Sequence, residues 1–177
     1  MFERLDKQVK AVLTVLPQEA AASGATTIEP EHMLMALASA PNTPAGGLLG
    51  RHGVGRSQVV QALQKASAGF TDEDEQALAA VGIDLAAITE AADRTFGQGA
   101  LSGAGVRAPR GGPRFSEAAK SVLAGAVQEC LLEQAKTVTT LHLLLALARD
   151  SRLSSSALLS GWGLDYDVIR RESSQAA

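Results

Sequence analysis

The sequence predicts an all-α protein made of two pseudo-symmetric four-helix repeats with an extra helical insert between them. One observation is a repeat: the segment from Thr27 to Ala38 returns without a gap as Thr137 to Ala148. Identical residues recur at this spacing of 110 positions over about fifty positions, which chance rarely produces. The other is composition, since alanine and leucine are abundant and aromatic residues make up only 3% of the chain. Valine, isoleucine and threonine do not cluster in alternating runs, so helices are favoured over strands.

Apolar residues spaced three and four apart predict the first long helix at residues 5–23. Pro17 removes a backbone donor and crowds the carbonyl of Leu13, so we expect a kink or a break just before it. Val127 holds the matching position in the second half. Residues 116–134 are therefore expected to form the straighter helix.

Three shorter helices are expected to follow in each half. A proline suited to the first turn of a helix opens the one at residues 30–40. The next begins near Gly46 and ends at Gly53, which can adopt a left-handed conformation. The fourth covers residues 56–67, and in the second half Asp165 stands where its side chain caps the matching helix.

The two halves are separated by a less typical stretch. Residues 73–96 repeat the helix–Gly–apolar–helix ending of both halves and predict an inserted half-unit. The segment Gly97 to Pro113 is rich in Gly, Pro and Arg and is expected to be a mobile linker. We therefore expect repeat 1 at 1–69, the insert and linker at 70–112, and repeat 2 at 113–177, joined in one compact domain.

Net charge and cysteine count exclude several classes of function. A formal net charge of −3 and a pI near 5.6 give no basic field to hold a nucleic acid backbone. The single cysteine, Cys130, excludes an internal disulfide and suits a reducing compartment, and we expect it to be a small core residue. No apolar run approaches the roughly 20 residues that span a bilayer. We expect a soluble, cytoplasmic protein that binds neither nucleic acid nor membranes.

Short motifs spread over both halves carry a family resemblance. They are the opening M-F-E-R, Gln18-Glu19-Ala20 on the first helix, the I-x-x-E-H-x-L segment from Ile28 to Leu34, the L-x-x-x-G helix ends and the aromatic restart at Phe115. Together they resemble the double repeat of the Clp N-terminal domain, which heads AAA+ unfoldases of the ClpA and ClpC type. The resemblance covers both halves and is weakest from about Phe70 to Gly112.

The resemblance implies a binding module without catalytic residues or a cofactor. In that family the domain receives substrates and adaptor proteins and passes them to the ATPase ring. Because the chain has no G-x-x-x-x-G-K-[ST] phosphate loop, we expect a stand-alone relative without unfolding activity. The implied partners are a Clp ATPase, adaptor or substrate proteins and peptides, and cyclic peptide ligands. The implied roles are adaptor, competitor or ligand-sequestering protein in Clp-dependent proteolysis.

The same resemblance implies a groove between the first helices of the two repeats. An aromatic pair with a flanking lysine makes a cleft suited to a peptide or a macrocycle. The residues that match the family's groove are Phe2, Leu13, Phe115 and Lys120.

A phosphoarginine site is the second implied feature. In ClpC-like members a Glu before the paired His of each repeat takes the guanidinium of a phosphorylated arginine, and free donors at a helix start hold the phosphate. Glu31 keeps this residue in the first repeat, whereas Leu141 replaces it in the second, so we expect one of the two sites to be lost. A first-turn Glu also stabilises any helix, so a structural role and a ligand contact stay equally open for Glu31.

His32 and His142 recur at the same place in both repeats. We expect each to cap its helix or bridge to a neighbouring helix, because a metal site needs further ligands at set spacing and only His52 remains. Two alternatives stay open. One is a small metal-dependent hydrolase that uses His32, Glu31 and His142, and the other is a structural subunit held in a stable complex through the insert.

Overall fold

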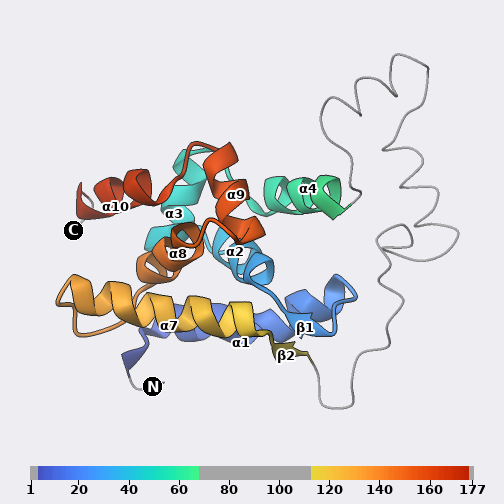
Figure 1. Cartoon of the computed structure of the whole chain (residues 1–177), viewed down its shortest axis with the longest axis horizontal. Coiled ribbons are helices and arrows are strands. Elements are labelled where there is room, and N and C mark those ends of the chain that lie inside the picture. Colours follow the sequence, from blue (N-terminus) through green and yellow to red (C-terminus); the bar gives the residue numbers. More distant parts are fainter. Residues whose placement is uncertain (1–3, 68–112, 176–177) are drawn as a thin grey trace, which may run out of the picture.

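The structure is a computed structural model that describes residues 4–67 and 113–175, which form eight helices and two short strands (Figure 1). The first repeat contains α1 (Lys7–Ala22), α2 (Pro30–Ala38), α3 (Pro44–Arg51) and α4 (Arg56–Ser67). The second contains α7 (Glu117–Leu132), α8 (Thr140–Arg149), α9 (Ser154–Gly161) and α10 (Tyr166–Gln175). The strands are β1 (Thr27–Ile28) and β2 (Arg114–Phe115). The all-α prediction with two four-helix repeats is confirmed, while the helical insert and linker predicted at 70–112 lie outside the described residues.

The spacing of the sequence repeat is also the spacing of the helices. Helices α1 and α7 begin and end 110 positions apart, and so do α3 and α9. Helices α2 and α8, and likewise α4 and α10, begin at the same spacing and differ only in where they end. Each helix of the first repeat therefore has one counterpart in the second.

Each repeat begins against a loop of the other repeat. Strand β1 pairs in parallel with β2, and the amide of Ser116 donates to the carbonyl oxygen of Ile28 over 3.0 Å. At the equivalent place Leu5 bridges to Val138, and the amide of Asp6 donates to the carbonyl oxygen of Val138 over 3.0 Å. Each repeat thus supplies backbone partners that the other would otherwise lack.

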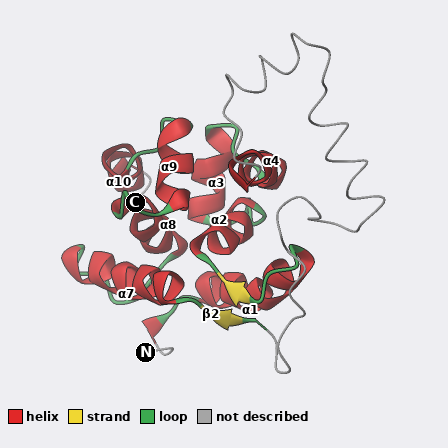
Figure 2. Cartoon of the chain, turned by 45° about the vertical axis from the view of Figure 1, so that its right-hand side comes forward, coloured by secondary structure: helices red, strands yellow, loops and turns green. Residues whose placement is uncertain are grey.

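Helices α2 and α8 form the centre of the molecule. Figure 2 shows them between a layer of α1 and α7 and a layer that includes α3, α9 and α10. Residues 32–38 and 142–148 are buried throughout, which suits helices that are apolar on all sides. Helix α3 contacts α8 and α9 contacts α2, so each third helix packs on the central helix of the other repeat.

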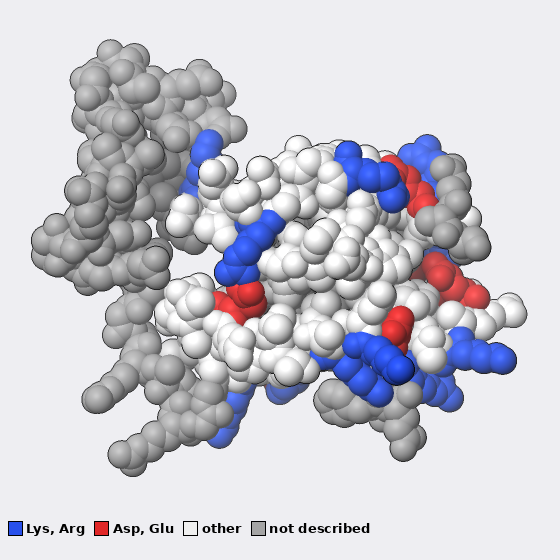
Figure 3. Space-filling model, turned by 180° about the vertical axis from the view of Figure 1, so that it is seen from behind, with Lys and Arg blue, Asp and Glu red and all other residues white. Residues whose placement is uncertain are grey.

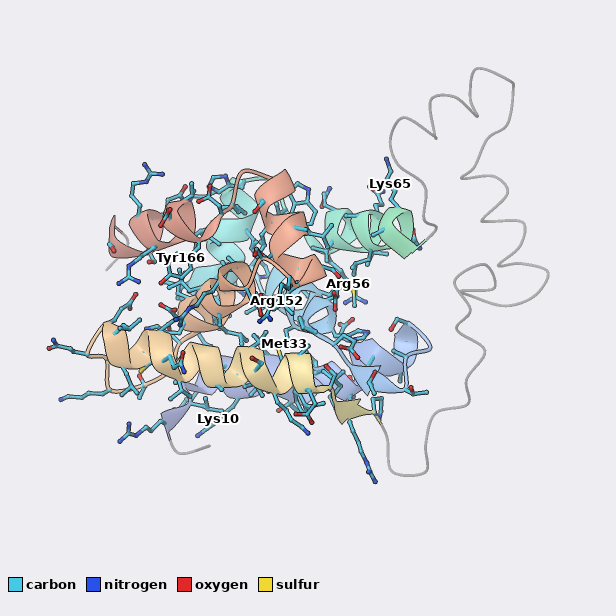
Figure 4. All side chains as sticks on the ribbon, viewed as in Figure 1. Lys10, Met33, Arg56, Lys65, Arg152 and Tyr166 are labelled. Atoms are coloured by element: carbon cyan, nitrogen blue, oxygen red, sulfur yellow. The ribbon has the colours of Figure 1, made fainter. Side chains whose placement is uncertain are left out.

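A glutamate from each first helix anchors the fourth helix of its own repeat. Glu129 is fully buried, and its carboxylate accepts hydrogen bonds from the Tyr166 hydroxyl (2.9 Å) and from Nη1 of Arg149 (3.1 Å). Its counterpart Glu19 accepts a hydrogen bond from Arg56. Arg56 begins α4 and Tyr166 begins α10, as Figure 4 shows. The two repeats therefore use different donors at equivalent positions for the same anchor.

Of the kink or break predicted just before Pro17, the break is wrong, because α1 continues from Lys7 to Ala22; the kink stays a prediction. Pro17 lies on the exposed side of the helix. Water can therefore replace the backbone donor that the proline lacks, and the apolar stripe of α1 holds both halves of the helix against the core.

Left-handed residues end the first and third helices. Gly53 and Gly163 both have φ 72° after α3 and α9, which confirms the predicted stop at Gly53. After α1 the left-handed residue is Gly24 (φ 73°), but after α7 it is Gln134 (φ 54°). The predicted cap at Asp165 is confirmed, since its carboxylate accepts from the amide of Val168 over 2.9 Å.

Cys130 is 4% exposed on α7, as expected of a small core residue, and burial raises the pKa of its thiol. Among the helices of the described part of the chain, none is both long enough and apolar enough to cross a membrane.

Candidate functional site

A small apolar cleft opens along the seam between α1 and α7, which belong to different repeats. It has a volume of about 40 Å³ and is closed from the core side by α8 and by the loop that precedes α8. Its lining consists only of apolar side chains: Leu5, Val9 and Leu13 from the first repeat, and Leu123, Ala126, Val127, Val138 and Leu143 from the second.

The lining of the cleft includes one pair of residues at equivalent positions of the two repeats. Leu13 and Leu123, which occupy equivalent positions, both line it and mark the middle of the seam. Leu5 lines the cleft, whereas Phe115, its counterpart in the second repeat, does not. The two equivalent positions also differ in size, since one holds a leucine and the other an aromatic residue.

The structure brings together only part of the predicted groove. Leu13 lines the cleft, whereas Phe115 is a half-buried residue of β2 and packs against the core cluster. Lys120 is exposed and pairs with Glu117 over 2.6 Å. Phe2 lies outside the described residues.

A second lysine stands at the equivalent place on the other helix. Lys10, labelled in Figure 4, corresponds to Lys120 and is also exposed. The seam therefore has a lysine on each of its two helices, at matching positions.

Sequence reasoning missed most of the lining. Leu5 and Leu123 could have been found from the repeat spacing, which maps them onto the predicted residues Phe115 and Leu13. Val138 and Leu143 carry no such signal. They reach the cleft because the loop before α8 pairs with the start of the chain at Leu5.

Glu31 is the second residue of α2 and is half-buried. Its carboxylate forms no hydrogen bond or ion pair within residues 4–67 and 113–175. Leu141, at the equivalent place in α8, is half-buried as well. A carboxylate thus stands at the start of α2 and a leucine at the start of α8.

Both predicted histidine caps are confirmed. Nδ1 of His32 accepts from the amide of Glu29 over 2.9 Å, and its Nε2 lies 2.9 Å from Oγ of Ser23. In the second repeat Nδ1 of His142 accepts from the amide of Thr139 over 2.9 Å, and Nε2 donates to Glu133 over 2.9 Å. Burial lowers the pKa of His32, which favours the neutral ring that can accept at Nδ1.

The hydrolase alternative gains no support from these positions. Both ring nitrogens of His32 and of His142 already form hydrogen bonds with residues of their own repeat. In the region that the structure describes, no group of three or more His, Cys, Asp or Glu side chains is placed to hold a metal ion.

One face of the molecule has an uncharged centre (Figure 3). Viewed from behind, its centre is uncharged and the lysines, arginines and carboxylates lie mainly toward the edge (Figure 3). Such a face suits contact with a protein better than contact with a polyanion.

Two solved structures resemble the fold over nearly their full length. The N-terminal domain of the caseinolytic protease associated chaperone ClpD from Arabidopsis thaliana has a TM-score of 0.61 and 17% identity, over 96% of this chain and 91% of that chain. A protein of a malarial protein secretion system has a TM-score of 0.63 and 14% identity, over 98% of this chain and 94% of that chain. At these identities the likeness shows the fold alone.

The sequence itself matches a protein family. No curated protein matches the chain. Residues 67–162, which are more than half of the 177 residues, match the Clp repeat (R) N-terminal domain. The chain therefore belongs to the Clp repeat (R) N-terminal domain family.

Proposed function

We propose that this protein is a non-catalytic binding module that receives peptides and unfolded or partner proteins at the cleft between α1 and α7. The observation that carries the proposal is the apolar cleft, which is lined from both repeats and has Lys10 and Lys120 at matching exposed positions. The partners are a Clp ATPase, its adaptors or its substrates, together with cyclic peptides. The module acts as an adaptor, a competitor or a sequestering protein in Clp-dependent proteolysis in the cytoplasm.

The size of the cleft limits what enters it. A volume of about 40 Å³ holds a group of about methyl size, so a ligand lies across the seam and inserts one small apolar group near Leu13. Each buried methylene contributes about 0.8 kcal/mol, so several weak contacts along the seam are needed for micromolar binding. Phe115 supplies such contacts beyond the cleft, and Phe2 is kept as a predicted contact. Lys10 pairs with an acidic group of the partner, and so does Lys120 when it exchanges Glu117 for the partner.

Glu31 is proposed as a single phosphoarginine contact. Its carboxylate has no partner among the described residues and stands in the first turn of α2, where a guanidinium can form a paired fork with it. Leu141 removes this contact from the second repeat. A phosphoarginine peptide should therefore bind with a stoichiometry of one, and Glu31→Gln should abolish binding.

A defined unfolded polypeptide tests the cleft. The probe is a fluorescein-labelled protein kept unfolded by reduction and carboxymethylation, and its binding is followed by fluorescence anisotropy. Leu13→Glu places a charge in the cleft and should weaken binding about tenfold or more. Leu131→Glu, which changes a leucine that is 58% exposed and outside the cleft, is the matched control and should bind like the wild type.

Two results would contradict the proposal. One is equal binding by Leu13→Glu and Leu131→Glu when both variants give wild-type circular dichroism and urea unfolding. The other is an unchanged affinity of Phe115→Ala together with an unchanged affinity of Leu13→Glu, which would place the site elsewhere on the molecule.

We also propose that residues 1–69 and 113–177 are the two repeats of one compact domain and that residues 70–112 are not needed for the cleft. Replacing 70–112 by a Gly/Ser linker of equal length should leave the affinity for the unfolded probe unchanged. A loss of binding together with intact folding would assign part of the site to the replaced segment.

A further inference from the structure

A second and larger cavity lies between α7 and the end of α8, away from the cleft. Its volume is about 330 Å³, which is in the range of pockets that hold small ligands. We name it the α7–α8 pocket. Its lining includes Ser121, Gly125 and Gln128 on α7, Ala146 and Arg149 on α8, and Leu153 just after α8.

One lining residue of the pocket is a glycine of α7 that lies close to α8. Gly125 lies over Ala146, and a Cβ atom added at Gly125 would stand 3.2 Å from the Cβ of Ala146. In the first repeat the exposed Val15 stands at the position of Gly125, and Ala36 at the position of Ala146. The missing side chain at Gly125 therefore allows α7 to lie close to α8 beside Ala146, at a position where the first repeat carries a valine.

Arg149 presents an open edge of its guanidinium at one end of the pocket. Its Nη1 group donates to Glu129 (3.1 Å) and to Gln128 (3.2 Å). The Nε and Nη2 groups have no acceptor among the described residues, and the side chain is 47% exposed. Nε and Nη2 form the edge of the guanidinium that binds a carboxylate through two parallel hydrogen bonds.

Buried contacts hold this edge in place. Glu129 is fully buried and is also held by the Tyr166 hydroxyl at 2.9 Å. Arg170 approaches the same carboxylate at 3.6 Å, so two guanidinium groups face one negative charge. Glu129 therefore fixes the orientation of Arg149 without neutralising both arginines.

The carboxylate of Asp150, which also lines the pocket, is engaged by another arginine. Nε and Nη2 of Arg152 donate to its two oxygens, each over 2.9 Å. Arg152 lowers the pKa of Asp150, so this pair stays ionised and close to neutral as a unit. The positive edge of Arg149 is thus the strongest open electrostatic feature of the pocket.

We propose that the α7–α8 pocket binds the C-terminal end of a peptide, with the terminal carboxylate on Nε and Nη2 of Arg149 and a small apolar last side chain over Gly125 and Ala146. The amide of Gln128, whose nitrogen has no acceptor in the described part of the chain, donates to the same carboxylate. The site is separate from the cleft between α1 and α7 and goes beyond the function proposed for it. A short free carboxylic acid shares this chemistry, and the experiment separates the two sources.

The test uses a fluorescein-labelled hexapeptide that ends in two alanines, as the free acid and as the C-terminal amide, with the full chain. The free acid should bind saturably, and the amide should bind about tenfold more weakly or not at all. Arg149→Lys keeps a positive charge beside Glu129 but loses the planar fork, and it should weaken binding about tenfold. Hexanoate should fail to displace the peptide at equal concentration.

Two rim variants provide a matched pair. Ala124, which is exposed and lines the pocket, corresponds to the exposed Thr14 on α1. Ala124→Phe should abolish binding of the free acid by filling the pocket, while Thr14→Phe should leave it unchanged. Both variants should bind the unfolded probe like the wild type, which separates a failure of this site from a failure of the cleft.

The proposal is overturned by equal affinity for the acid and the amide, by unchanged binding in folded Ala124→Phe, or by absence of binding at about 1 mM peptide. Displacement by hexanoate at equal concentration would overturn the choice of a peptide and leave a simple carboxylate as the ligand.

Discussion

Leu13 and Leu123 hold equivalent positions in the two repeats, 110 residues apart, and line the same cleft. They meet because the start of each repeat pairs with the backbone of the other repeat. The amide of Asp6 donates to the carbonyl oxygen of Val138, and the amide of Ser116 donates to that of Ile28. The duplication therefore creates a surface that one repeat alone does not have.

Tyr166→Phe should destabilise the protein by about 2 kcal/mol, because it removes a hydrogen bond to the fully buried carboxylate of Glu129. Urea unfolding measures the change as a lower midpoint at constant slope. In a Glu129→Gln background the same substitution should lower the free energy of unfolding by clearly less, since the charged acceptor is gone. Equal costs in both backgrounds would show that the hydrogen bond is not what Tyr166 contributes.

Gln134→Gly should stabilise the protein by about 1 kcal/mol, because Gln134 occupies a left-handed conformation that glycine adopts without strain. The reverse change at the equivalent position, Gly24→Gln, should destabilise it by a similar amount. Thermal unfolding of both variants checks the prediction. A lower midpoint for Gln134→Gly would show that the glutamine side chain has a stabilising contact of its own.

Stability should fall as the pH drops below about 6.5, because burial lowers the pKa of His32. The unfolded chain then binds a proton at His32 that the folded protein binds less readily, so acid favours unfolding. Nearby Glu31, Glu29 and Glu19 oppose this shift without reversing it. The contribution of neutral His32 to the free energy of unfolding is fully present above pH 6.5. It is lost as the pH falls toward the pKa of His32 in the folded state.

The check is urea unfolding between about pH 5 and 8 for the wild type and for His32→Asn, whose side chain can still accept from the amide of Glu29. The variant should lose stability less steeply below pH 6.5. Identical slopes for the two proteins would contradict the role given to His32.

Gly46→Ala should destabilise the protein by about 1–3 kcal/mol, because a Cβ there would lie only 1.9 Å from the carbonyl oxygen of Ala40 and the backbone must shift. Gly50→Ala is the matched control in the same helix. Nothing lies within 4 Å of a Cβ at Gly50, so this change should stabilise α3 by about 0.5–1 kcal/mol. Effects of the same sign in the two variants would contradict the account of the turn before α3.

The helices were predictable from local signals. Apolar spacing, the first-turn proline Pro30 and left-handed glycines are properties of short segments, and they placed α1 to α4 and their counterparts close to their observed bounds. The start predicted near Gly46 was late, because Pro44 is itself the first residue of α3. No break occurs at Pro17, because a proline on an exposed helix face can be tolerated when the opposite face is packed.

The site was predictable only in part, because it depends on contacts between distant segments. Leu13 was expected in the groove, but the cleft also uses Val138 and Leu143, which the pairing of Leu5 brings to the seam. The burial of Glu129 was not expected either, because a glutamate on a helix is usually exposed. Its donors come from Arg149 and Tyr166 on other helices, which no local pattern indicates.

Methyl NMR of a leucine-labelled sample, titrated with the unfolded probe, tests the central claim most directly. The methyl signals of Leu13 and Leu123 should shift together and saturate at one concentration. The methyl signals of the exposed residues Leu131 and Leu132, which lie outside the cleft, should not shift. Shifts at Leu131 and Leu132 with unchanged signals from Leu13 and Leu123 would contradict the claim that the seam between the repeats is the binding site.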